Sequence, residues 1–427
     1  MAVPSAAMAL LALLSSSIRV LKNAALFKMA DLLMIVPHTA FGHTITGSDV
    51  LRRVYPTKRS VVVLFSDYRL HNSKLSLLWE NPRFLSLPLS YEVTPKISSF
   101  RLPCIQSHKD FVRGAIVMLI RALARPDVET IRMEDLYLAI KLPALDIDRS
   151  KLIINYVWTI GYFNLIKEVD APPLRLPEPI RRSITERLDE LDSAKATRKV
   201  KRCALYLRQK KEHAADYHNS RRCGSPFADY LEAVRFLNVS GYQVLVTGDV
   251  SIPSEVAREF RGMFVDARSS GVDQGLFDLY AGTECDIFVG DPGGGVWLPG
   301  LNRIPRLLIN AFPFFFGLPN SWVNYKTLLD DRGRLIHYDR LFSEFAHDYD
   351  LVGYTLQNNS SAEILQAVET FLQDLEHPEN PDPGREILDR VPDYIWAKHA
   401  GTRICRSWLR LFDEQMDRDP AVQIEVR

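Results

Sequence analysis

The sequence has few cysteines, no long apolar run and no excess of charge of either sign. Its five cysteines are scattered and none forms a CxxC pair, so neither a disulfide framework nor a cysteine zinc site is indicated. Lysine plus arginine number 53 and aspartate plus glutamate 52, which disfavours a nucleic-acid coat. No stretch approaches the roughly 20 apolar residues that cross a bilayer. We therefore predict a cytoplasmic protein that binds no nucleic acid and whose anion sites are local.

The first 28 residues combine an apolar run with later basic residues. Residues 8–14 are apolar, and Arg19, Lys22 and Lys28 follow them. A secretory signal carries its basic residues before the apolar run, so a cleaved signal is disfavoured. An interfacial helix, or a helix packed on the protein, fits the pattern better. Peripheral contact of residues 2–28 with the inner face of a membrane stays open as a hypothesis.

The remaining chain alternates short apolar runs with amphipathic stretches, and its 427 residues suit two cores. Strands are expected at residues 32–36 and 60–65, and again from residue 203 onward at 203–207, 242–247, 286–289 and 306–310. Because these runs lack polar alternation, they predict strands covered on both faces, as in a doubly wound parallel sheet. The predicted divisions are an N-terminal helix (1–28), a first lobe (29–170), a proline-rich and charged linker (171–201), a second lobe (202–385) and C-terminal helices (386–427).

A glycine-rich loop follows the predicted strand 286–289. Residues 290–295 read Gly-Asp-Pro-Gly-Gly-Gly, and loops at the carboxyl ends of parallel strands are where ligands bind. Three glycines let backbone N–H groups approach an anion, and a helix opening after them would direct its positive end at a phosphate. The alternative is a strand-to-helix turn that needs unusual dihedral angles. The loop is neither GxGxxG nor a Walker loop, which disfavours NAD and P-loop sites.

Basic residues gather around the first strand of the second lobe. Residues 195–222 contain ten lysines and arginines and only two acids. Arg208 and Lys210 come directly after the strand, where an arginine fork can clamp a diphosphate. Residues 195–202 are more typical of a solvated linker. Further along the same predicted edge, Asp249 and Asp266 are suited to accept ribose hydroxyls, although Asp249 is equally typical of a turn.

Several segments of this lobe carry a resemblance to a known family. They are Tyr206-Leu207-Arg208, Ser240-Gly241-Tyr242, Val246-Thr247-Gly248-Asp249, Cys285-Asp286-Ile287-Phe288-Val289-Gly290 and Leu298-Pro299. Over about residues 200–320 the chain resembles bacterial glycosyltransferases with surface-polysaccharide functions, and the first lobe is similar only through Gly42-His43. In that family the loop after the last strand typically reads Gly-Thr-Ser-Ser-Gly, whereas here it is Gly-Asp-Pro-Gly-Gly-Gly.

The resemblance implies the GT-B fold, with two Rossmann-like lobes of parallel sheets, a cleft between them and C-terminal helices able to cross back to the first lobe. It implies a nucleotide-sugar donor in the second lobe, an acceptor in the first and transfer without a metal ion or other cofactor. The layout is similar to fucosyltransferase-like enzymes, so we expect hexosyl or deoxyhexosyl transfer to a glycan, lipid-linked or protein acceptor.

The predicted site follows from these expectations. Transfer with inversion needs a base on the acceptor hydroxyl, for which His43 or His38 is predicted, with Asp49, Asp67 and Glu80 as alternatives. The predicted donor-binding residues are Arg208, Lys210, Gly248, Asp249, Asp266, Asp291, Gly293, Gly294 and Gly295, and Arg208 also counts as catalytic. Two alternatives stay open: an epimerase or hydrolase of the sugar nucleotide, and an inactive nucleotide-binding relative.

Overall fold

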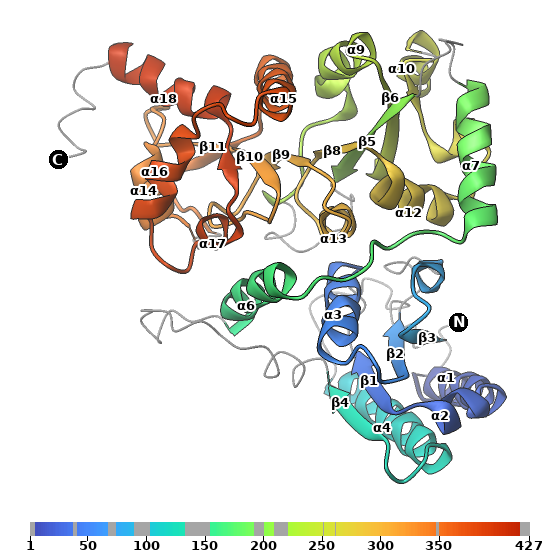
Figure 1. The fold of residues 1–427 in the computed structure, drawn as a ribbon. Helices are drawn as coiled ribbons and strands as arrows, with labels where there is room; N and C mark the ends of the chain where they lie inside the picture. Colours follow the sequence, from blue (N-terminus) through green and yellow to red (C-terminus); the bar gives the residue numbers. More distant parts are fainter. Residues whose placement is uncertain are drawn as a thin grey trace. The chain divides into compact units, whose positions relative to one another are not determined.

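The computed structural model describes residues 5–36, 41–66, 74–88, 103–132, 154–191, 200–208, 221–250, 252–260, 262–346 and 350–418. The chain divides into two compact units, which we treat separately (Figure 1). Unit 1 comprises residues 1–141 and 169–172, and unit 2 comprises residues 142–168 and 173–427.

Unit 1 is built on a parallel four-stranded sheet in the order β3-β2-β1-β4. Its strands are β1 (Leu32–Val36), β2 (Ser60–Ser66), β3 (Arg83–Pro88) and β4 (Glu129–Arg132). Its helices are α1 (Ser5–Lys22), α2 (Ala24–Met29), α3 (Phe41–Val54) and α4 (Pro103–Leu123), with the short turn η1 (Leu75–Leu78).

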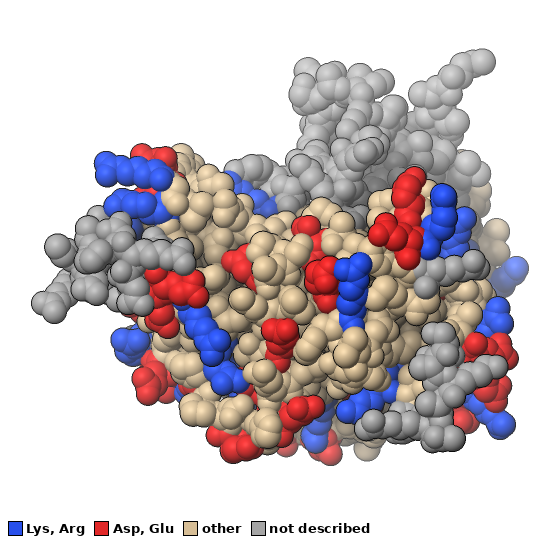
Figure 2. Space-filling model, turned by 90° about the horizontal axis from the view of Figure 1, so that it is seen from above, with Lys and Arg blue, Asp and Glu red and all other residues tan. Residues whose placement is uncertain are grey.

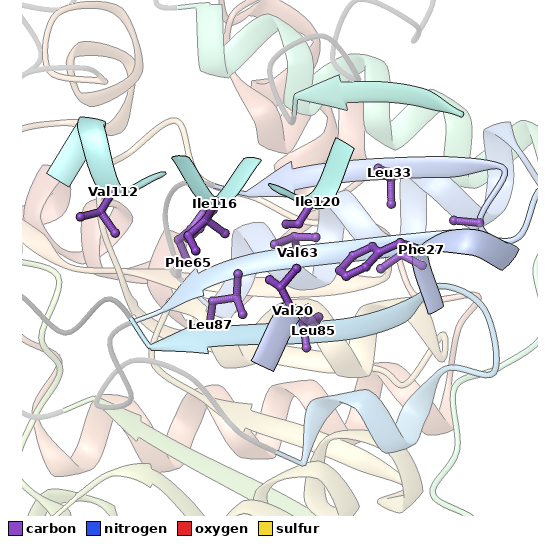
Figure 3. Packing of buried hydrophobic residues seen from close by; sticks show 12 residues of the cluster. Val20, Phe27, Leu33, Val63, Phe65, Leu85, Leu87, Val112, Ile116 and Ile120 are labelled. Atoms are coloured by element: carbon purple, nitrogen blue, oxygen red, sulfur yellow. The ribbon is translucent and has the colours of Figure 1, made fainter. Parts of the chain in front are cut away.

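Alternate residues of β2 divide the core of unit 1 between the two faces of the sheet. Val61, Val63 and Phe65 pack with Val20 of α1 and with the inner side of α4 (Figure 3). Val62 and Leu64 are also fully buried, and α3 lies on the opposite face (Figure 1). Because a strand presents successive side chains to opposite faces, a strand covered on both faces is apolar throughout, as predicted.

Unit 2 is built on a seven-stranded sheet in the order β13-β10-β9-β8-β5-β6-β7, and every neighbouring pair is parallel. The strands are β5 (Lys201–Arg208), β6 (Tyr242–Asp249), β7 (Phe264–Val265), β8 (Ile287–Gly290), β9 (Arg306–Ala311), β10 (Ser321–Tyr325) and β13 (Arg403–Ile404). A separate antiparallel pair joins β11 (Thr327–Leu329) to β12 (Thr355–Gln357). The predicted α/β class with two parallel sheets is therefore confirmed.

The helices of unit 2 connect these strands and cover the sheet. Those that precede β9 are α6 (Ile154–Glu168), α7 (Glu178–Leu191), η3 (Phe227–Tyr230), α9 (Leu231–Val239), α10 (Ser254–Glu259), α11 (Ala267–Ser270), α12 (Gln274–Glu284), η4 (Gly294–Val296) and α13 (Trp297–Leu301). Those that follow it are α14 (Tyr338–Ser343), α15 (Ser361–Glu376), α16 (Pro383–Arg390), α17 (Trp396–Ala400) and α18 (Arg406–Arg418). The last helix belongs to unit 2, where the Trp408 ring lies 5.3 Å from that of Tyr325.

Helix α6 shows how aromatic packing overrides position in the chain. Residues up to 170 were expected in the first lobe, but α6 clusters with unit 2. The ring of its Tyr162 lies 6.0 Å from Trp297, and that of Phe163 lies 6.3 Å from Trp396. Both α6 residues are fully buried. Because large aromatic side chains dominate core packing, these contacts place α6 with unit 2 although it follows unit 1 in the sequence.

Hydropathy and surface charge describe two further properties of the chain. Among the described residues, no helix is both long enough and apolar enough to span a bilayer. Figure 2 shows basic and acidic side chains interspersed on the face it displays, and neither sign forms a continuous patch there.

Candidate functional site

The sheet of unit 2 reverses its winding between β5 and β8. From β5 the chain proceeds outward to β6 and β7, then returns to place β8 on the other side of β5, followed by β9 and β10. In open parallel sheets a ligand binds outside the carboxyl ends of the strands at this kind of reversal. Arg208 ends β5 and the glycine loop follows β8, so both predicted features meet at this edge.

Arg208 is fixed through its backbone. Its N–H donates to Oδ2 of Asp291 at 2.8 Å, and its carbonyl accepts from the N–H of Gly224 at 3.1 Å. It pairs in register with Asp249, the last residue of β6. Its side chain is half-buried, and its charge acts on both Tyr206 and Cys223. The guanidinium group therefore starts from a rigid strand end beside the glycine loop.

Asp291 is a buried acceptor that joins neighbouring elements. Besides the Arg208 N–H, it accepts from the hydroxyl of Tyr230 at 2.8 Å and from Nδ2 of Asn310 at 3.4 Å, both on Oδ1. The residue has no exposed surface, and this burial raises the pKa of its carboxyl to about 6. Both carboxylate oxygens are thus occupied by groups of the protein, which gives Asp291 a positioning role at this edge.

The glycines after β8 make room for Tyr206. A Cβ on Gly290 would lie 1.9 Å from the Tyr206 carbonyl oxygen, and one on Gly295 would lie 2.6 Å from the Tyr206 ring. A Cβ on Gly293 would lie 3.0 Å from the Tyr206 hydroxyl. The ring stacks on Phe288 at 5.9 Å, and its hydroxyl accepts from the N–H of Gly295. Close packing against the Tyr206 side chain therefore accounts for Gly293 and Gly295, and close approach to the Tyr206 backbone accounts for Gly290.

The helix that follows the glycine loop is short. Gly294 begins η4, a 3-10 turn of three residues, and α13 continues it for only five. A single short turn of this kind carries little of the dipole that a longer helix presents to an anion. That the start of this short helix holds a phosphate stays a prediction.

The other predicted residues of this edge have different structural roles. Gly248 has φ +98°, and a Cβ there would lie 2.4 Å from the Leu207 carbonyl oxygen, so its role is conformational. Asp249 is exposed. Asp266 is the N-cap of α11 and accepts from the Ser269 N–H at 2.6 Å. Lys210 lies outside the described residues.

The predicted acceptor side is described only in part. His38 lies outside the described residues. His43 lies in the first turn of α3, which begins at Phe41, and its side chain is not described. Asp49 is fully buried and binds Arg52 and Arg53 at 2.5 and 2.7 Å, which is a structural use. Glu80 is exposed, and Asp67 lies outside the described residues.

Sequence reasoning missed Lys326, which follows β10 at the same edge. Its Nζ donates to the carbonyls of Arg221 and Cys223 at 2.8 and 2.7 Å. Burial lowers the pKa of Lys326 to about 8, and the charge of Asp291 partly opposes that shift. The signal available in the sequence was weak, because the five residues before this lysine, Ser-Trp-Val-Asn-Tyr, mix polar and apolar side chains.

A pair of asparagines was missed as well. The N–H of Asn310 donates to Asn359 Oδ1 at 2.9 Å, and the N–H of Asn359 donates to Asn310 Oδ1 at 2.6 Å. Both residues are buried. They join the end of β9 to the segment before α15, so polar groups at this edge are satisfied by long-range bonds.

Comparison with known proteins gives structural likeness alone. No protein-family model matches the chain, and no curated protein matches it in sequence. A family 9 glycosyl transferase from Veillonella parvula is 13% identical, with 82% of this chain and 98% of that one covered at a TM-score of 0.46. The ADP-heptose lipopolysaccharide heptosyltransferase II of E. coli is 12% identical over 81% and 99%, with a TM-score of 0.44. The iron-containing dodecameric heptosyltransferase TibC, solved with ADP-D-beta-D-heptose, is 15% identical over 83% and 78%, with a TM-score of 0.39.

The edge of unit 2 thus combines one half-buried arginine with a buried network that fixes it. Among the residues that the structure describes, no group of three or more His, Cys, Asp or Glu side chains is arranged to hold a metal ion. The chemistry available at the edge is charge neutralisation by Arg208 together with hydrogen bonding by Asp249 and backbone groups. That chemistry suits a phosphorylated ligand with polar hydroxyls.

Proposed function

We propose that unit 2 binds a nucleoside-diphosphate sugar at the carboxyl ends of β5 and β8, and that the chain is a glycosyltransferase of the GT-B type. The observation that carries the proposal is the position of Arg208, which ends the strand at which the sheet reverses its winding. Asp291 holds the backbone of that arginine, and the exposed Asp249 lies beside it in register. The resemblance around residues 200–320 supports the same substrate class.

In the proposed reaction Arg208 neutralises charge on the departing nucleoside diphosphate. Charge develops there as the bond between the sugar and the diphosphate breaks, and a cation already in place stabilises it without reorganisation. His43 or His38 is the proposed base that takes the proton of the acceptor hydroxyl. The acceptor is a glycan, a lipid-linked sugar or a protein. Cationic side chains take the place of a metal ion in this scheme, so transfer should survive treatment with a chelator.

The first experiment is a thermal-shift panel of ADP, GDP, UDP and CMP with their common sugar conjugates. A ligand that binds only the folded state raises its apparent stability. A shift with one nucleoside diphosphate defines the donor class, and heptosyl conjugates of ADP belong in the panel beside hexosyl and deoxyhexosyl conjugates. Product analysis then separates transfer from epimerisation or hydrolysis, and binding without turnover would favour an inactive relative.

Arg208→Ala tests the clamp itself. Loss of a charge-assisted contact should weaken binding of the nucleoside diphosphate by about 1.5–3 kcal/mol, roughly 10-fold to 150-fold, and leave nucleoside binding nearly unchanged. Arg208→Lys should give a smaller loss because it keeps the charge without the fork. Arg235→Ala is the matched control, because Arg235 pairs with Glu232 on α9. Equal weakening of nucleotide and nucleoside binding in Arg208→Ala would contradict the clamp.

A further inference from the structure

In the described part of unit 1, the helices α1, α2 and α4 leave seven large apolar side chains exposed to solvent. On α1 these are Leu10, Leu14, Ile18 and Leu21, on α2 Met29, and on α4 Phe111 and Met118. Their exposed fractions run from 48% to 69%. Elsewhere among the described residues, the exposed large apolar side chains are Val239 and Val352, which belong to unit 2.

These side chains lie on other sides of their helices than the side chains that the helices bury. Helix α1 packs along α4, and α2 contacts both. The inner side of α4 points Val112, Ile116 and Ile120 into the core, as does Val20 of α1 (Figure 3). Leu14 and Ile18 are one turn apart on α1, and Phe111 and Met118 are seven residues apart on α4, so each pair forms a stripe on the outer side of its helix. Helices of one layer present their outer sides in the same direction.

The charges beside this surface are mainly basic. Arg19, Lys22 and Lys28 are exposed, and residues 1–30 contain no aspartate or glutamate. On α4, Arg121 is exposed, and the helix has one acid, Asp110. An apolar stripe flanked by basic residues is the pattern of a helix that lies in a membrane interface, where anionic headgroups attract the cations.

We propose that the outer surface of α1, α2 and α4, which we call the α1–α4 surface, docks on an anionic lipid bilayer. The apolar side chains insert to about 5–10 Å, at the boundary between headgroups and acyl chains. The basic residues remain among the headgroups. The helices lie on the bilayer and do not cross it. This proposal is independent of the proposed activity, because every residue that carries it belongs to unit 1 and none belongs to the Arg208 edge.

The test is sedimentation of the full chain with vesicles of phosphatidylcholine alone and of phosphatidylcholine mixed with phosphatidylglycerol. We expect binding to the anionic vesicles that weakens as salt is raised, because surface charges are screened. Leu14→Ser with Ile18→Ser, and separately Phe111→Ser with Met118→Ser, should each lower the vesicle partition coefficient roughly tenfold or more. Lys22→Glu with Lys28→Glu should remove most of the preference for anionic vesicles.

Val239→Ser with Val352→Ser is the matched control, because it removes the same number of exposed apolar side chains from unit 2. It should leave vesicle binding unchanged. Since every substituted side chain is exposed, thermal denaturation should confirm that all variants fold. The proposal is overturned if the full chain does not bind anionic vesicles or if the control lowers binding as much as the α1–α4 variants. It is also overturned if the α1–α4 variants abolish a concentration-dependent dimer instead, since the surface would then be covered by a second copy.

Discussion

Removal of the Asp291 carboxylate should destabilise unit 2 far more than removal of a carboxylate that makes the same kind of bond in solvent. Strand β8 is flanked by two such residues. Asp286 precedes it and accepts the Arg202 N–H at 2.7 Å, and Asp291 follows it and accepts the Arg208 N–H at 2.8 Å. Asp286 is exposed, whereas Asp291 is fully buried. The pair therefore compares one backbone hydrogen bond at two levels of burial.

The expected magnitudes follow from the groups left without a partner. In Asp291→Ala the Arg208 N–H and the Tyr230 hydroxyl lose their acceptor inside the protein, at about 1–3 kcal/mol each, so the loss should be about 2–6 kcal/mol. In Asp286→Ala water replaces the lost acceptor, and the loss should be about 0.5–1.5 kcal/mol. The first value is a large share of the 5–15 kcal/mol typical of a folded domain.

Because the chain has two units, a single unfolding midpoint does not isolate unit 2. Amide hydrogen exchange of the β5 segment, read by mass spectrometry, measures the opening of this sheet directly. Asp291→Ala should raise exchange at β5 strongly, and Asp286→Ala should raise it little. Similar increases in the two variants would refute the assignment of Asp291 as a buried acceptor whose cost of removal is set by burial.

Two further predictions concern the same edge. Burial lowers the pKa of Lys326 to about 8, whereas the pKa in the unfolded chain is near 10.5. Between these two values the folded state holds fewer protons than the unfolded state, so the folded state gains stability as pH rises. In denaturant titrations the stability of the wild-type chain relative to Lys326→Met should therefore increase over that range, and a difference that does not change with pH would exclude the pKa shift. Gly295→Ala should destabilise the chain because the new Cβ meets the Tyr206 ring. In a double-mutant cycle with Tyr206→Ala, the coupling energy between the two substitutions should be about 0.5–3 kcal/mol. If the two losses of stability are strictly additive, the Tyr206 ring is not the group that requires the glycine.

The strands of both sheets could be predicted wherever an apolar run had no polar interruption. Strands β1, β2, β5 and β6 were all expected close to their observed bounds. Strand β10 was missed because it carries Ser321 and Asn324, which are polar yet buried. A buried strand need not be an apolar run where its polar side chains form hydrogen bonds inside the protein.

The site was predicted in position but not in detail, because the partners of its residues are distant in the sequence. The loop at 290–295 was expected at a strand end and is found there. The packing of the loop glycines was not predicted, because they contact Tyr206, which lies more than 80 positions earlier in the chain. The helix cap formed by Asp266 could have been predicted from the sequence, since Ser269 follows at the spacing of a capping box.

The packing of the glycines changes which residues the proposed nucleotide site depends on. If Tyr206 accounts for Gly290, Gly293 and Gly295, recognition of a diphosphate falls mainly on Arg208, whose backbone is fixed by Asp291. Asp291→Ala should then weaken nucleoside-diphosphate binding as well as stability, because the Arg208 N–H loses the side-chain acceptor that fixes the end of β5. Asp286→Ala should leave nucleoside-diphosphate binding unchanged and cost only the smaller loss of stability given above, because its bond is made at the opposite end of the same two strands. The same pair of variants therefore tests both the buried network and its connection to the proposed ligand site.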